Sequence, residues 1–192
     1  MSVNKSLAVI LGCGMMLGTA QLSAAPTASM LADTCAGCHG TDGNSVGPAT
    51  PTIAGMSAAY FNDTMEAYQS GDRKSTIMGR IAKGYTKDEI KLMGDHFAAL
   101  EFAPTNQKLD AEKVKAGAIL YPKNCDKCHD ESGALADDDA GILAGQWLPY
   151  LTYSMQDFKS GAREMPKKMR KKVEKLDDFD IDALMHYFAS QR

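Results

Sequence analysis

The 192-residue sequence predicts an all-α protein made of two tandem domains related by internal duplication. The pentapeptide pattern C-x-x-C-H occurs at 35–39 and at 125–129, so its two copies are 90 residues apart. The residues after each copy align at this offset without a gap for almost forty positions. Apolar residues recur at helical spacing in both halves, and no segment shows the convincing alternation of a half-buried strand. We therefore expect two small helical domains of one fold.

The repeat continues well beyond the motifs. At offset 90 the matched pairs include Gly43 with Gly133, Tyr60 with Tyr150, Met65 with Met155 and Arg73 with Arg163. One inserted residue then moves the offset to 91, which pairs Ile90 with Ile181 and Phe97 with Phe188. This continuity predicts an N-terminal domain over 26–104 and a C-terminal domain over 105–192, with a linker near 101–110.

Helix signals appear at equivalent places in the two halves. The segment 86–100 opens with the capping-box pair Thr86 and Glu89, and its counterpart 177–190 opens with Asp177 in the capping position. Two further segments end at a glycine stop, and two lead into the C-x-x-C-H motifs. These four predicted helical segments are 57–71, 148–161, 28–39 and 111–129. A unit of 80–90 residues buries little core unaided, so a bound group that supplies apolar surface is expected.

The first 25 residues are predicted to be a signal peptide. They contain Lys5, an apolar stretch over 7–20 and a small-residue end, with cleavage after Ala24 or Ala25. The apolar stretch is short for a membrane span, and no later stretch is longer, so no membrane span is expected. A lipoprotein signal at Cys13 is the alternative, but the apolar stretch continues past that residue. Export places the mature chain in an oxidising compartment such as the periplasm.

Composition excludes a general polyanion-binding protein. The formal net charge is −3, with 44% hydrophobic and 23% charged residues. Basic character is confined to the stretch EMPKKMRKKV at 164–173, so it needs a local explanation. The stretch is either a solvated surface or the charged surroundings of a functional site, and a nucleic-acid partner is not expected.

The two C-x-x-C-H motifs predict covalent haem attachment. In each motif the two thiols and the histidine lie on one side of a helical turn, so the thiols can bond the haem vinyl groups while the imidazole reaches the iron. A zinc site requires cysteine pairs much closer together in sequence, and a thioredoxin-like pair or two disulfides explain neither histidine. The predicted attachment residues are Cys35, Cys38, Cys125 and Cys128, with iron ligands His39 and His129.

The sixth iron ligand is expected to be a methionine in each domain. Met78 lies 39 residues after the first motif histidine, and Met169 lies 40 residues after the second. These two methionines align at the offset of 91 that Ile90 and Ile181 define, whereas Met165 aligns with Lys74. Met78 and Met169 are therefore the predicted ligands, with Met165 as the alternative for the second haem. His96 and His186 occupy non-equivalent positions and are expected to be structural or surface residues.

Three stretches carry a family resemblance: CAGCHGTDGNSVGPATPTIAG, STIMGRIAKGY and LAGQWLPYLTYSMQDF. The chain resembles the diheme c-type cytochromes of the c-four class and, more closely, the cytochrome subunits of flavocytochrome c sulfide dehydrogenases, over essentially the whole mature sequence. This resemblance implies two class I cytochrome c folds with two covalently bound haem c groups. It also implies a heterodimer with an FAD-containing flavoprotein subunit that oxidises sulfide, and a soluble periplasmic electron acceptor. No catalytic residue is expected on this chain.

The two halves differ in the residues that would orient the axial histidines. In the first half, Pro48 or Pro51 offers a carbonyl to His39, whereas Asp138 and Gly141 occupy those positions in the second half. The hydrogen-bond partner of His129 is therefore not assigned from the sequence, and the two haems are expected to differ in reduction potential. A tyrosine (Tyr60 and Tyr150) and an arginine (Arg73 and Arg163) also recur in the two halves. They are expected either to hydrogen-bond the haem propionates or to share a packing role.

Two other functions fit part of the pattern. One is a free diheme electron shuttle to a terminal oxidase, which would copurify without a flavoprotein. The other is a diheme peroxidase, which needs an open sixth position at one haem and is disfavoured by two methionine ligands.

Overall fold

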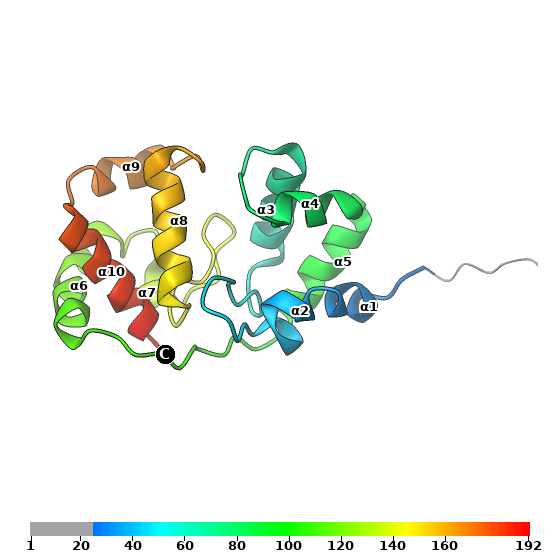
Figure 1. The fold of residues 1–192 in the computed structure, drawn as a ribbon, viewed down its shortest axis with the longest axis horizontal. Helices are drawn as coiled ribbons and strands as arrows, with labels where there is room; N and C mark the ends of the chain where they lie inside the picture. The colour runs from blue at the N-terminus through cyan, green and yellow to red at the C-terminus, as the bar shows by residue number, and fades with distance from the viewer. Residues whose placement is uncertain (1–24) are drawn as a thin grey trace, which may run out of the picture.

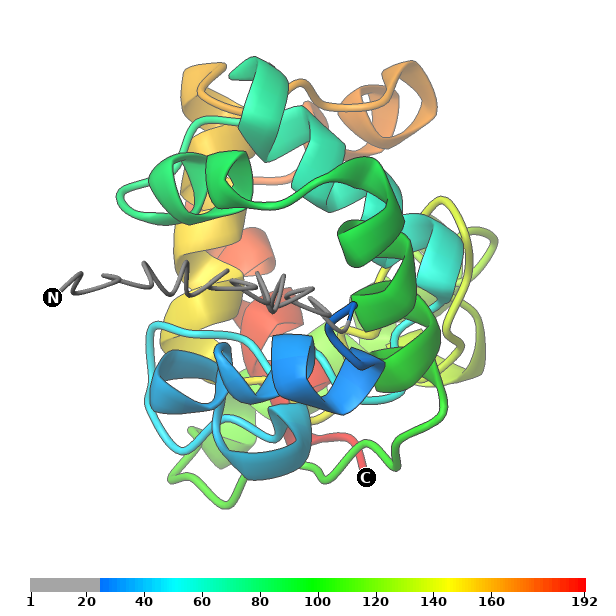
Figure 2. The same cartoon turned by 90° about the vertical axis from the view of Figure 1, so that its right-hand side faces the viewer.

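A computed structural model describes residues 25–192, so the predicted signal peptide and Cys13 lie outside the described residues apart from Ala25. The described chain forms two helical lobes joined by an extended linker (Figure 1). No strand occurs within 25–192, as the all-α prediction requires. In the view of Figure 2, the N-terminal helices, blue to green, lie in front of the C-terminal domain.

The N-terminal domain is built around a core in which Phe61, Ile90 and Phe97 are buried. Thr86 and Glu89 form the predicted capping box of α5, and Gly71 ends α3 in the left-handed conformation. The elements are α1 (Ala28–Asp33), α2 (Ala36–His39), η1 (Thr41–Gly43), α3 (Ala58–Ser70), α4 (Met78–Ile81), η2 (Ala82–Gly84) and α5 (Lys87–Ala98).

The C-terminal domain repeats this plan around Tyr121, Leu184 and Phe188. Asp177 takes the predicted capping position at the start of α10, and the structure adds a capping box with Asp180. The helix expected over 111–129 ends earlier, at Asn124, and the second C-x-x-C-H motif continues it as turns. The elements are α6 (Ala111–Asn124), α7 (Asp130–Gly133), α8 (Leu148–Ser160), α9 (Lys167–Val173) and α10 (Asp178–Ser190).

The duplication extends to single hydrogen bonds. The amide of Ile53 donates to the Gly43 carbonyl at 2.8 Å, and the amide of Leu143 donates to the Gly133 carbonyl at 2.8 Å. Both glycines have positive φ, and a Cβ at Gly43 would meet the Phe97 ring at 2.9 Å. Gly133 faces Phe188 in the same way, so the paired glycines allow one loop to pass over the same aromatic residue in each domain.

The domains meet through a small apolar cluster and several polar contacts. Met56 of one domain packs with Ile142 and Ala144 of the other. Trp147 donates from Nε1 to the Ser45 carbonyl at 3.1 Å, and Ser57 donates to Asp138. These contacts hold the loops that follow the two motifs against each other. Within the described range, no helix is long and apolar enough to cross a bilayer.

Candidate haem sites

The first C-x-x-C-H motif forms a helical turn at α2. Cys35 is half-buried, Cys38 is exposed and His39 is buried, and both cysteines are free thiols. The His39 amide donates to the Cys35 carbonyl at 2.9 Å, which fixes the histidine one turn beyond the first cysteine. Burial raises the pKa of the Cys35 thiol and thus favours its neutral form beside an apolar wall. The turn therefore has the arrangement that haem attachment needs.

The orientation of His39 is fixed by a backbone carbonyl. Its Nδ1 donates to the Pro51 carbonyl at 2.8 Å, so Nδ1 carries the proton and Nε2 is left to bind iron. This contact identifies Pro51, rather than Pro48, as the residue that supplies the carbonyl. Burial lowers the pKa of His39, partly offset by this hydrogen bond, and so favours the neutral imidazole that a metal requires.

The second motif has the same cysteine pattern but a different histidine environment. Cys125 is half-buried and Cys128 is exposed. Burial raises the pKa of the Cys125 thiol to about 11, while Lys172 acts in the opposite direction. The imidazole of His129 makes no hydrogen bond among residues 25–192 and lies edge-on to Phe188, at 6.1 Å between ring centroids. Gly141, at the position of Pro51, does not replace the missing carbonyl contact.

Met78 lies on the same apolar wall as the first motif. It is the first residue of α4, is half-buried, and packs with Cys35 against the core of the N-terminal domain. The first attachment cysteine and the methionine that the sequence predicts as a ligand therefore pack against the same hydrophobic core. The wall also includes Ile53, Tyr68, Tyr85 and Leu100.

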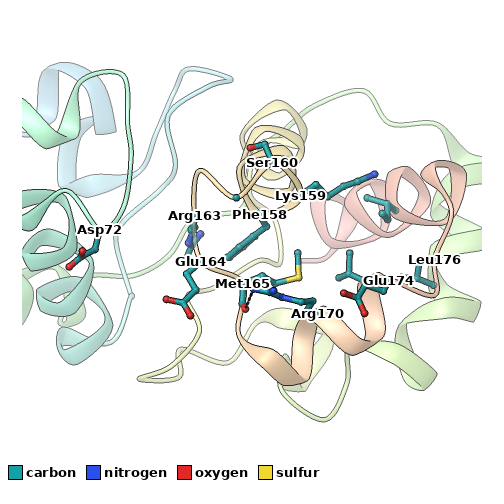
Figure 3. Close-up of a pocket in the computed structure, with 13 residues that line it drawn as sticks. Asp72, Phe158, Lys159, Ser160, Arg163, Glu164, Met165, Arg170, Glu174 and Leu176 are labelled. Atoms are coloured by element: carbon teal, nitrogen blue, oxygen red, sulfur yellow. Dashed lines mark hydrogen bonds between the residues drawn. The ribbon is translucent and has the colours of Figure 1, made fainter.

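The two candidate methionines of the second half have different surroundings. Met169 is half-buried on α9, on the helix face of Lys172, whose Nζ donates to the Lys123 carbonyl at 2.7 Å next to the second motif. Met165 is buried just before α9 and lines a hollow bounded also by Phe158, Leu176 and Ile181. Figure 3 shows its sulfur pointing toward the middle of that hollow, while Arg170 donates to the Met165 carbonyl at 3.4 Å.

A cluster of arginines and tyrosines spans the domain interface. Arg163 donates from Nη2 to the Tyr60 hydroxyl at 3.3 Å, although these residues belong to different domains. Arg73 lies over the Tyr68 ring, and Arg163 lies over the matching Phe158 ring. Burial alone would raise the pKa of Tyr60, but the guanidinium groups of Arg163 and Arg73 lower it.

The charges of this cluster bear on whether the site fits a haem. Arg73 and Arg163 are half-buried, and neither has a carboxylate within salt-bridge distance in the described part of the chain. Charged groups that leave water normally have a partner of opposite charge. The propionates of a haem are anions of the required kind. The free thiols, the neutral histidines, the apolar wall and these arginines together fit haem c.

The structure also shows a buried polar pair that the sequence did not single out. Gln146 and Thr52 form a fully buried polar pair across the domain interface. The sequence contains one clue to this pair: at offset 90, Gln146 stands opposite Met56 in an otherwise matched stretch. The basic stretch, by contrast, is largely solvated, since Lys167, Lys168 and Lys171 are exposed on α9.

Comparisons with known proteins agree with this architecture. The family model "Cytochrome c" matches residues 24–100, and the model "Cytochrome C oxidase, cbb3-type, subunit III" matches residues 112–188. A solved structure of reduced recombinant cytochrome c4 from Pseudomonas stutzeri aligns with a TM-score of 0.75 and 23% identity, over 88% of this chain and 100% of the other. This likeness supports the two-domain fold.

Two curated relatives are similar in sequence. The chain is 48% identical to the cytochrome subunit of sulfide dehydrogenase from Chlorobaculum tepidum over 71 residues. These residues make up 37% of this chain and 64% of that protein. It is 36% identical to a thiosulfate dehydrogenase electron acceptor from Stutzerimonas stutzeri, over 81% of this chain and 78% of the relative. With both motifs held in cytochrome c domains, the chain belongs to the diheme class I c-type cytochromes and carries two covalent haem c groups.

Proposed function

We propose that this chain is the electron-transfer subunit of a periplasmic sulfide dehydrogenase. It receives electrons from an FAD-containing flavoprotein subunit and passes them to a soluble periplasmic carrier. The observation that carries the proposal is the 48% identity to the cytochrome subunit of sulfide dehydrogenase, on a chain that retains two complete haem-attachment motifs. The predicted signal peptide, cleaved after Ala24 or Ala25, supports export.

Each haem is proposed to have one histidine and one methionine as axial ligands. His39 and Met78 serve the N-terminal domain, and His129 and Met169 serve the C-terminal domain. Bound haem supplies a one-electron Fe(III)/Fe(II) couple, whose potential a methionine sulfur raises. The chain's own role is to hold the histidines neutral, to bind the propionates with Arg73 and Arg163, and to exclude water with the apolar walls.

Substrate oxidation is assigned to the partner subunit. Every cysteine after Cys13 belongs to a C-x-x-C-H motif, and the sequence has no glycine-rich dinucleotide fingerprint. Oxidation of HS⁻ to sulfur releases two electrons and one proton, and a flavin accepts electrons in pairs. Two one-electron centres on one chain would match that donor, with one centre for each electron of the pair.

The longer match to a thiosulfate dehydrogenase electron acceptor supports a second candidate. In that case the chain is a free diheme carrier that collides with its dehydrogenase, rather than a subunit bound to a flavoprotein. Purification from the native host separates the two candidates. A stable complex with one flavin for every two haems and sulfide-dependent haem reduction supports the subunit role, whereas a flavin-free diheme protein contradicts it and supports the free carrier.

A further inference from the structure

A buried side chain of the C-terminal domain binds the backbone of the N-terminal domain. Gln146 is 0% exposed, and so is Thr52, which lies 94 residues earlier. The Thr52 amide donates to Gln146 Oε1 at 3.0 Å, and Gln146 Nε2 donates to the Thr52 carbonyl at 2.8 Å. A glutamine amide that both accepts and donates in this way fixes the backbone on both sides of one residue.

The same peptide unit orients the axial histidine. The amide of Thr52 and the carbonyl of Pro51 belong to one peptide bond, and this carbonyl accepts the 2.8 Å hydrogen bond from His39 Nδ1. An acceptor on the N–H side of a peptide polarises its carbonyl and strengthens the hydrogen bond that the carbonyl accepts. A continuous relay therefore runs from Gln146 through the Pro51–Thr52 peptide to His39.

The second half contains the equivalent contact, related by the repeat, but there it does not extend to the motif histidine. At offset 90, Thr52 corresponds to Ile142 and Gln146 corresponds to Met56. The Ile142 amide donates to Met56 Sδ at 3.3 Å, so a weak thioether acceptor takes the place of the amide oxygen. Among residues 25–192, no hydrogen bond joins the Gly141 carbonyl to His129. The relay is thus complete only toward the N-terminal haem.

We propose that Gln146 is a positioning residue that tunes the haem of the opposite domain, through the Pro51–Thr52 peptide and His39. The proposal rests on the axial role of His39 proposed above. A more strongly hydrogen-bonded Nδ1–H gives the imidazole more anionic character, which favours ferric iron and lowers the potential. Gln146 therefore holds the potential of the N-terminal haem below the value that an unpolarised carbonyl would give.

The test is replacement of Gln146 by an apolar residue of similar size in the holoprotein. Gln146→Met copies the partner found at position 56, and Gln146→Leu serves if the first variant loses haem. Both are expected to shift the ferrous-to-ferric ratio of the N-terminal haem about two- to fivefold toward ferrous iron at fixed ambient potential. Spectroelectrochemical titration measures this shift, and proton NMR of the ferric haem methyl groups reports any rotation of the His39 ring.

Two matched variants separate the relay from general loosening of the interface. Trp147→Phe removes a neighbouring interdomain hydrogen bond without touching the Pro51–Thr52 peptide, and Met56→Gln strengthens the incomplete relay. Both are expected to leave the two potentials unchanged. An unchanged N-terminal potential in Gln146→Met, or an equal shift in Trp147→Phe, overturns the proposal. Loss of the histidine–methionine spectrum in a Gln146 variant that keeps both haems would also contradict it. None of these readings depends on sulfide or on a flavoprotein.

Discussion

The residues around the two axial histidines differ although the motifs are the same. His39 has a carbonyl acceptor on Nδ1, whereas His129 has an aromatic edge beside it and no such acceptor in the described chain. Burial lowers the pKa of both histidines, so both present a neutral imidazole. Because hydrogen bonding at Nδ1 changes the electron density that the ring offers iron, the two haems are expected to have different potentials.

The identity of the second methionine ligand can be tested by single substitutions. Met169→Ala is expected to remove the red charge-transfer band of methionine-ligated ferric haem from one of the two haems, because the thioether bond to iron is lost. Met165→Ala should keep the band but destabilise the fold by about 2–3 kcal/mol, because Met165 is buried. Absorption spectra and thermal unfolding of the holoproteins distinguish these outcomes.

Met78→Ala is the matched control for that experiment. It should remove the band from the other haem, so that the double variant of Met78 and Met169 has none. If Met165→Ala removes the band and Met169→Ala retains it, the ligand is Met165 and the offset of 91 does not apply to this loop.

At the scale of elements, the packing of α6 against α10 depends on close approach and one histidine. Gly117 of α6 lies against Ala183 and Tyr187 of α10, where a Cβ would have no room. The Asp110 amide, at the N-cap of α6, donates to His186 Nδ1 at 3.2 Å. His186 is buried and therefore structural, as its non-equivalent position in the repeat suggested. This hydrogen bond requires an unprotonated Nδ1.

The α6–α10 pair is therefore expected to weaken in mild acid. Burial lowers the pKa of His186, outweighing the nearby Asp182 and Asp110 carboxylates, and Lys113 also lowers it. A histidine whose pKa is lower in the folded state contributes stability above its unfolded pKa of about 6.5, and that contribution is lost as pH falls below this value. Thermal unfolding of the holoprotein between about pH 8 and pH 5 should show the loss.

His186→Asn provides the control, because its Oδ1 can accept the Asp110 amide and does not titrate. The variant should lose the part of the pH dependence that lies near neutrality. An identical pH profile in the variant and the natural protein would mean that another group is responsible.

The helices illustrate what could be inferred from local sequence. The structure confirms the helix starts predicted from Thr86 with Glu89 and from Asp177, and the helix ends predicted from the two glycine stops. These ends could be predicted because a capping residue acts on backbone groups only a few residues away. The end of α6 at Asn124 was not predicted, since apolar spacing continues through Cys125 while the backbone leaves the helical region there. Spacing alone does not distinguish a helix from the series of turns that follows it.

At the scale of the whole molecule, the duplication predicted two domains but not how they meet. The interface joins residues such as Thr52 and Gln146, or Ser45 and Trp147, that are about a hundred positions apart and share no local pattern. Tyr60 and Arg73 recur in the second half, yet only the structure shows that Arg163 reaches Tyr60 across the domain interface. Long-range pairing depends on shape and chain path, which the repeat does not encode.

The charge distribution leads to a prediction about partner encounter. The chain carries a net charge of −3, but Lys167, Lys168 and Lys171 form an exposed basic face on α9, beside the proposed ligand Met169. Charge reversal of these three lysines to glutamate should slow haem oxidation by ferricyanide about tenfold or more at low ionic strength, because the anion is no longer attracted to this face. Stopped-flow rates measured over a range of salt concentrations test this expectation.

Lys172 is left unchanged because its ammonium group donates to the Lys123 carbonyl and is part of the fold. Reversal of Lys74, Lys83 and Lys108, which are exposed and outside salt bridges in the described chain, changes the net charge by the same amount at other places. If local steering is the cause, this control slows the reaction less, and the difference between the two variants disappears as salt shortens the Debye length to about 3 Å near 1 M. Equal slowing would show that the α9 face has no special role, and no slowing in the α9 variant would show that electrons leave elsewhere.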